Sequence, residues 1–214
     1  LKDAVLNYIA LLGWSPKGER EIFTLPELVG EWDPAGISKS PAIFDGQKLR
    51  YINGEYIRAL SPEQFYERAL PWMRQTVKSE TADLRALAGV LQARCEVLSD
   101  IPEQVDFIDT VPEYDLALYT NKKMKPTPET SLAALRETLP VLEGLADFTA
   151  EAIHTALFER IAQLEVKNGW LLFPLRVAVS GKQFTPGGGI ELCAILGKEE
   201  SIRRVKAAIQ KLEG

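Results

Sequence analysis

The spacing of apolar residues along the 214-residue chain is helical almost throughout. Val5, Ile9 and Leu12 recur at intervals of four and three residues, which is the period of one helix face. Gly13 follows directly and is expected to end this helix. Because the segment has few polar positions, we expect it to be largely buried.

Further helices are expected at residues 25–32, 44–60, 129–143, 149–166, 172–180 and 199–213. Ser61-Pro62-Glu63 reads as a helix start, with a Ser cap, Pro at the first helical position and an acid in the first turn. A long helix after it carries an apolar stripe of Leu84, Leu87, Leu91, Cys95 and Leu98. Strand signals are nearly lacking, although 175–179 has the composition of a short strand. We predict an all-α fold with a boundary at residues 60–61.

Composition excludes several classes of protein. Hydrophobic residues make up 46% and charged residues 26%, as in ordinary globular proteins. No apolar run approaches the roughly 20 residues needed to span a bilayer, so we expect a cytoplasmic protein. Only Cys95 and Cys193 are present, outside any metal-binding spacing, and buried thiols are the favoured interpretation. Leu1 begins a helical pattern directly, so the chain is expected to be an excised fragment.

A search for catalytic chemistry gives a negative result. Gly187-Gly188-Gly189 lacks the Lys and Ser/Thr of a phosphate-binding loop, so a hinge or tight turn is the better interpretation. His154 is the only histidine, and we assign it a structural role. Residues 37–40 (ISKS) resemble a class I synthetase signature but lack its leading lysine. We therefore predict no catalytic residue and no metal site.

Several segments, in order, resemble bacterial glutamyl-tRNA synthetases. They are LNYIALLGW at 6–14, REIFT at 20–24, SPAIFD at 40–45, KLRYINGEYIR at 48–58, PLRVAVSG at 174–181 and AILGKE at 194–199. The resemblance implies a stem-contact helical domain at 1–60, followed by a two-part, all-helical anticodon-binding domain at 61–140 and 141–214. It also implies that a separate Rossmann-type domain, not in this chain, uses ATP and Mg²⁺. The chain alone is then expected to need no cofactor and to be inactive in catalysis.

Arg94 aligns with the family arginine that reads the third anticodon letter and favours tRNA-Glu over tRNA-Gln. A guanidinium is suited to this because it hydrogen-bonds base edges or stacks on bases that a loop splays out. The alternative from the residues alone is an arginine at the flank of the apolar stripe, with its stem on the core and its charge in water.

The resemblance assigns further anticodon contacts to Arg176, Thr185 and Pro186. Arg176 follows an apolar run, where an unpaired charge is costly, so it is expected to face RNA or a buried acid. The chain then departs from the family pattern, since three glycines stand where one glycine and a bulky residue are typical. Gly189 is the nearest match to the next contact, where a glycine leaves only main-chain groups to make it.

A second, weaker set of candidates concerns the tRNA stem and backbone. Lys48, Arg50, Asn53 and Arg58 lie close together on one predicted helix and are candidates for phosphate contacts. A solvated helix face explains them equally well. Lys122, Lys123 and Lys125 are a phosphate rim or a soluble loop.

The partner implied by the resemblance is tRNA-Glu, with no DNA and no membrane, and a monomer is expected on family grounds. The net charge of −5 does not oppose this, because local basic patches and not total charge set phosphate affinity. The alternative function is a free-standing helical module, derived from such a synthetase, that binds protein or tRNA.

Overall fold

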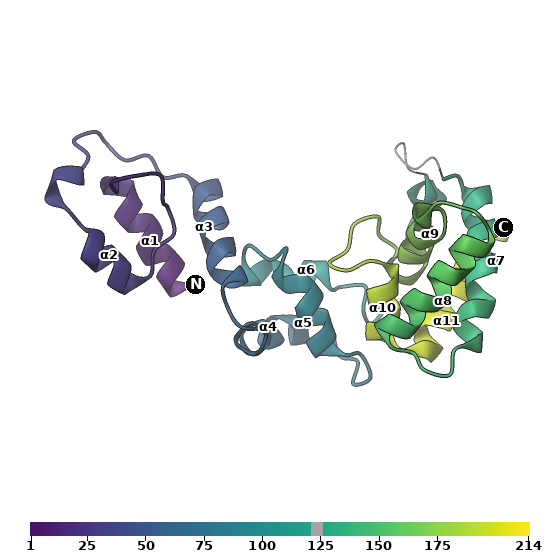
Figure 1. The fold of residues 1–214 in the computed structure, drawn as a ribbon. Helices are drawn as coiled ribbons and strands as arrows, with labels where there is room; N and C mark the ends of the chain where they lie inside the picture. Colours follow the sequence, from purple (N-terminus) through teal and green to yellow (C-terminus); the bar gives the residue numbers. More distant parts are fainter. Residues whose placement is uncertain (121–125) are drawn as a thin grey trace.

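The computed structural model describes residues 1–120 and 126–214. In these residues the only regular elements longer than four residues are α-helices, and they form three groups in a row (Figure 1). The first group holds α1 (Lys2–Gly13), α2 (Leu25–Glu31) and α3 (Gly46–Arg58); the second holds α4 (Pro62–Thr76), α5 (Leu84–Gln92) and the one-turn α6 (Ile101–Gln104). The third holds α7 (Pro128–Gly144), α8 (Ala150–Gln163), α9 (Asn168–Ser180), α10 (Gly189–Leu196) and α11 (Lys198–Glu213). The predicted all-α fold is confirmed.

The helix starts follow the local sequence. The Ser61 hydroxyl accepts a hydrogen bond from the Gln64 amide at 3.2 Å, which satisfies a donor that the helix itself leaves free. Thr149 caps α8 through the Ala152 amide at 3.2 Å in the same way. Both helix starts were predicted from the sequence and are confirmed.

The prediction that α1 is largely buried is wrong. Its inner face consists of Ala4, Asn7 and Tyr8, whereas Val5 is 42% and Ile9 57% exposed. The buried Asn7 side chain fixes this orientation, because it donates to the Glu21 carbonyl at 2.8 Å and accepts from the Phe23 amide at 2.7 Å. These hydrogen bonds satisfy the buried Asn7 amide, which would be costly to leave unpaired.

One prediction about the later helices also fails. The stripe that begins at Leu84 does not continue as one helix, because α5 ends at Gln92 and Cys95 lies beyond it, still buried. The helix predicted at 172–180 is confirmed as part of α9, and residues 175–179 form no strand. Helix α10 was not predicted at all. Nearly all of its residues are buried, so it shows no alternation of polar and apolar faces.

The hydrophobic cores divide the chain once. Two small clusters lie in the first group, around Tyr8 with Ile52 and around Trp14 with Phe23. One larger core begins at Ile57, near the end of α3, and runs to Ala208 through the second and third groups. Residue 60 lies between α3 and α4, but residue 140 lies inside α7, so the expected boundary there cuts a helix. We propose two packing units, 1–60 and 61–214.

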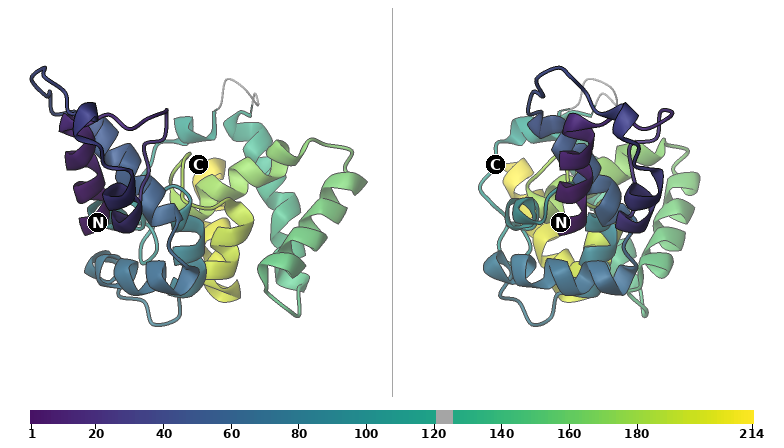
Figure 2. Two further views of the ribbon diagram at one scale, coloured as in Figure 1. Left: turned by 60° about the vertical axis from the view of Figure 1, so that its left-hand side comes forward. Right: turned by 90° about the vertical axis from the view of Figure 1, so that its left-hand side faces the viewer.

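One buried arginine connects distant parts of the larger core. Arg204 on α11 is 2% exposed and donates to the carbonyls of Phe107 at 2.8 Å, Ile108 at 2.6 Å and Val179 at 2.6 Å. These carbonyls follow α6 and end α9, so one side chain joins the second group to the third. The end-on view in Figure 2 shows the first group in front of this body.

Within the described ranges, no helix combines the length and the apolar character that crossing a membrane requires.

Candidate nucleic-acid interface

The predicted anticodon residues come together around one loop. This loop, residues 181–188, connects α9 to α10 and extends from the third group toward the second (Figure 1). Arg176 precedes it on α9, Thr185 and Pro186 lie within it, and Gly189 begins α10. Arg94 reaches it from the end of α5. Two segments that are far apart in sequence, the end of α5 and residues 176–189, therefore build one site.

Arg94 lies just after the last turn of α5, and not on a helix face. The amides of Arg94 and Cys95 both donate to the Leu91 carbonyl at 3.0 Å, so the chain turns sharply there. Cys95 is buried, whereas the side chain of the preceding Arg94 is exposed. The exposed Arg94 side chain then donates from Nη1 to the Thr185 carbonyl at 2.7 Å. Its other N–H groups are left for further contacts.

Arg176 is half-buried, and its charge is poorly compensated. Its Nη1 donates to the Gln183 carbonyl at 3.2 Å, while its buried Nε has no partner among the described atoms. Burial lowers the pKa of Arg176, and the nearby charge of Arg94 lowers it further, opposed only by Glu191. Neither arginine forms a salt bridge with another described residue, so the buried acid considered in the sequence analysis is not found. Two adjacent guanidinium groups in this state favour a bound anion or a base edge.

Thr185 and Pro186 are both buried and give the loop its shape. The Thr185 hydroxyl donates to the Gly187 carbonyl at 2.5 Å, so it is already used within the loop. Gln183 donates from Nε2 to the carbonyls of Leu118 at 2.8 Å and Thr120 at 3.1 Å. The loop is therefore held on both sides by hydrogen bonds, and its exposed groups are presented on a fixed backbone.

Two of the three glycines, predicted to be a hinge or a tight turn, have a packing or capping role. A Cβ on Gly189 would lie 3.0 Å from the Arg176 main-chain nitrogen and 3.0 Å from Leu175 Cγ, so only glycine lets α10 approach α9 this closely. The Gly188 amide donates to Glu191 Oε2 at 2.9 Å and so caps the start of α10. Gly189 is buried, and its part in the site is to place Arg176 and the loop.

Sequence reasoning missed one exposed side chain in this loop. Phe184 is 82% exposed and lies between Gln183 and Thr185, whose carbonyls accept from Arg176 and Arg94 respectively. The only available signal was an aromatic residue among polar loop neighbours. His154, assigned a structural role, lies exposed on α8 and stacks on Phe158 with ring centroids 4.0 Å apart.

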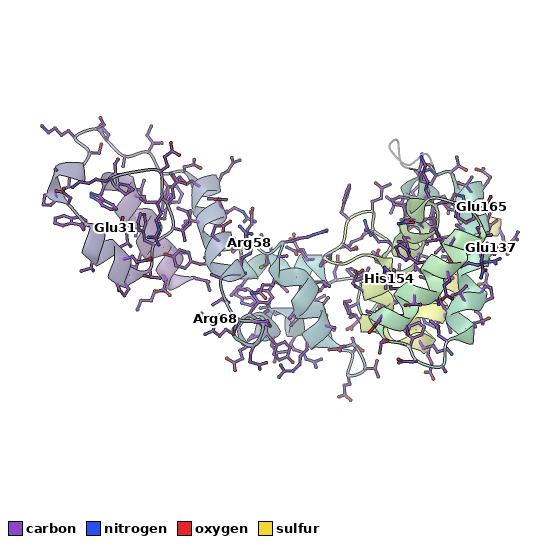
Figure 3. The ribbon with its side chains drawn as sticks, viewed as in Figure 1. Glu31, Arg58, Arg68, Glu137, His154 and Glu165 are labelled. Atoms are coloured by element: carbon purple, nitrogen blue, oxygen red, sulfur yellow. The ribbon has the colours of Figure 1, made fainter. Side chains whose placement is uncertain are left out.

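The candidates for the tRNA stem do not form a free cationic surface. Lys48 pairs with Glu21 at 2.5 Å, Arg50 with Glu96 at 3.3 Å and with Asp100, and Arg58 with Glu55. Asn53 is 7% exposed and hydrogen-bonds the Glu96 carbonyl. Figure 3 shows Arg58 where the first group meets the second. Lys122, Lys123 and Lys125 lie outside the described residues.

A helical scaffold that places two arginines, without acidic partners among the described residues, beside a loop with an exposed aromatic ring has the composition of a single-stranded nucleic-acid site. The class of protein suggested by fold and site is thus a helical RNA-binding domain. A sequence model described as "anticodon binding domain" matches residues 64–209, which is most of the chain. The chain belongs to the anticodon binding domain family.

Comparison with individual proteins gives similar relatives. The chain is 53% identical to the glutamate–tRNA ligase of Clostridium tetani and 50% identical to that of Clostridium acetobutylicum, each over 213 residues. It is matched over its whole length but spans only 43% and 44% of those relatives. A crystal structure of a glutamate tRNA ligase from Elizabethkingia meningosepticum superposes with a TM-score of 0.83 at 28% identity, over 99% of this chain and 41% of that one.

Proposed function

We propose that this chain is the anticodon-reading part of a glutamate–tRNA ligase and that its partner is tRNA-Glu. The observation that carries the proposal is the meeting of Arg94, Arg176 and the 181–188 loop at one site, where two cations lack acidic partners among the described residues. The similarity to the glutamate–tRNA ligases supports the identity of the tRNA.

In this proposal the whole ligase attaches glutamate to tRNA with ATP and Mg²⁺, and this chain does no chemistry itself. Arg94 reads the third anticodon letter and favours C over G, which separates tRNA-Glu from tRNA-Gln. Arg176 supplies a second cation, and Thr185 and Pro186 shape the loop that carries the site. The protein is expected to act as a monomer in the cytoplasm.

The stem-facing role of 1–60 is the weaker part of the proposal. Lys48, Arg50 and Arg58 must exchange carboxylate partners for phosphates on binding, which lowers their net contribution because the existing pairs have to break. Asn53 acts as a structural residue unless the first group moves. The anticodon site carries most of the expected specificity.

A salt titration of tRNA affinity tests the proposal. The chain is titrated with tRNA-Glu, tRNA-Gln and a tRNA-Glu whose third anticodon letter is changed to G. We expect the logarithm of the affinity to fall linearly with the logarithm of the salt concentration, with a slope of about −0.7 for each phosphate neutralised in a single strand. We also expect the unaltered tRNA-Glu to bind most tightly. Equal binding of all three contradicts anticodon reading, and binding of none supports the alternative of a protein-interaction module.

A further inference from the structure

Phe184 is the one large hydrophobic side chain after Tyr51 that is exposed in the described part of the chain. The other exposed large hydrophobic residues lie in the first group, between Val5 and Tyr51. In the second and third groups the remaining large hydrophobic side chains of the described residues are buried or half-buried. A ring that is 82% exposed next to the anticodon site therefore needs a reason of its own.

The loop presents this ring in a fixed position. The residue before Phe184 is held by Arg176 through the Gln183 carbonyl and by hydrogen bonds of its own side chain. The residue after it is held by Arg94 through the Thr185 carbonyl. Lys182 is fixed to Asp106 and, at 3.1 Å, to the Glu103 carbonyl. Since adjacent Cα atoms are about 3.8 Å apart, the ring starts within one residue of both arginine contacts.

We propose that Phe184 is a base-stacking residue: a nucleobase splayed from a single-stranded RNA loop lies on its ring, while Arg94 and Arg176 bind the base edge or the flanking phosphate. Single-stranded nucleic-acid sites combine these two features, an aromatic platform and nearby cations that follow the backbone. The fixed loop favours this role because little conformational freedom is lost when the base stacks. A protein partner would be expected to need a larger apolar surface than one ring.

The inference rests on the proposed function and adds to it a residue that the sequence comparison with synthetases did not assign. The inference also assigns two different roles to residues of the site. The arginines supply charge and base-edge hydrogen bonds, whereas Phe184 supplies affinity that does not depend on base identity, because every base has a face that can stack.

Substitutions at Phe184 test the platform through affinity. With tRNA-Glu, Phe184→Ala is expected to bind about 5- to 150-fold more weakly than the unaltered chain, the range found for loss of one stacked base. The slope of affinity against salt should not change, because no charge is removed. Phe184→Leu keeps an apolar side chain but not the flat ring and should lose most of the same affinity. Phe44→Ala removes an exposed ring, 68% exposed, from the first group and should change affinity less than about twofold.

Phe184→Trp tests stacking directly. This variant should keep the affinity of the unaltered chain, and its added indole fluorescence should be quenched when tRNA-Glu binds. An acceptor-stem hairpin without an anticodon loop should not quench it. The change in fluorescence is compared with that of the unaltered chain, because four other tryptophans are present.

The outcomes separate this inference from the proposed function. If the unaltered chain binds tRNA-Glu with anticodon preference but Phe184→Ala and Phe184→Leu bind equally well, the stacking role is wrong and the proposed function stands. If the Trp variant binds without quenching, the stacking role is likewise wrong. If the unaltered chain binds no tRNA, both proposals fail.

Discussion

Arg94 donates a hydrogen bond of 2.7 Å to the main-chain carbonyl of Thr185, although the two residues are 91 positions apart. This contact joins the end of α5 to the loop before α10 and sets the geometry of the site. An arginine that was predicted to read RNA thus also positions the loop that carries its neighbours. The two roles give different results on mutation.

Arg94→Gln is expected to reduce the preference for C over G at the third anticodon letter by about 1–3 kcal/mol, because a bidentate base contact is lost. Affinities for tRNA-Glu and its third-letter variant, measured at one salt concentration, give the difference. Arg68→Gln is the control, since Arg68 is exposed on α4, away from the loop (Figure 3). If Arg94→Gln keeps the full preference, the reading role is contradicted. Holding the loop through the Thr185 carbonyl would then be the one role left for Arg94.

Arg203 and Arg204 form a matched pair for testing stability. Both bind Glu200, but the Arg203 side chain is 64% exposed and the Arg204 side chain only 1%. Arg204→Met leaves three carbonyls without a donor and should lower the free energy of unfolding by about 3–5 kcal/mol. Arg203→Met removes a surface pair and should cost less than about 1 kcal/mol. Urea unfolding followed by circular dichroism measures both, and similar losses would show that the buried network is not what stabilises the core.

The sequence predicted most of the long helices because caps and periodicity are local signals. Ser61 and Thr149 each start a helix through a side-chain hydrogen bond to an amide three residues on, which four neighbouring residues are enough to define. Helix α10 was missed for the opposite reason. It is buried on most sides, and its existence depends on packing against α9, which no local pattern encodes.

The site was predicted only in part. Arg94, Arg176 and Thr185 were identified by resemblance, and the structure brings them to one loop. Phe184 could not be singled out, because exposure of an apolar residue is a property of the whole fold. The inner face of α1 was assigned wrongly because hydrophobicity was weighed above the two hydrogen bonds that bury Asn7.

Glu200 gives a prediction about pH. Its hydrogen bond to Arg203 lowers its pKa below the usual 4.5, against the opposing effect of burial and with further lowering from Arg204. A carboxyl with a lowered folded-state pKa stabilises the fold fully above its unfolded pKa and stops doing so as pH falls through the folded one. The unfolding free energies of the unaltered chain and Glu200→Gln should therefore differ most at neutral pH and converge below pH 4.5. A constant difference across this range would contradict the assignment.

Gly189 and Gly89 form the last matched pair, since both are glycines in helices with different surroundings. Gly189→Ala places a methyl group 3.0 Å from the Arg176 main-chain nitrogen and 3.2 Å from the Leu172 carbonyl oxygen. Main chain cannot move aside cheaply, so we expect a loss of about 1–3 kcal/mol in unfolding free energy.

In Gly89→Ala the added methyl group lies on the exposed side of α5 and meets no atom within 4 Å. This variant should raise the free energy of unfolding by about 0.5–1 kcal/mol, because alanine loses less backbone entropy than glycine when a helix forms. Urea midpoints measure both variants. Because α10 carries the loop, Gly189→Ala should also weaken tRNA binding, whereas Gly89→Ala should not. Equal stability of the two variants would mean that α10 can shift away from α9, and the close approach would then not be what fixes Arg176 beside the loop.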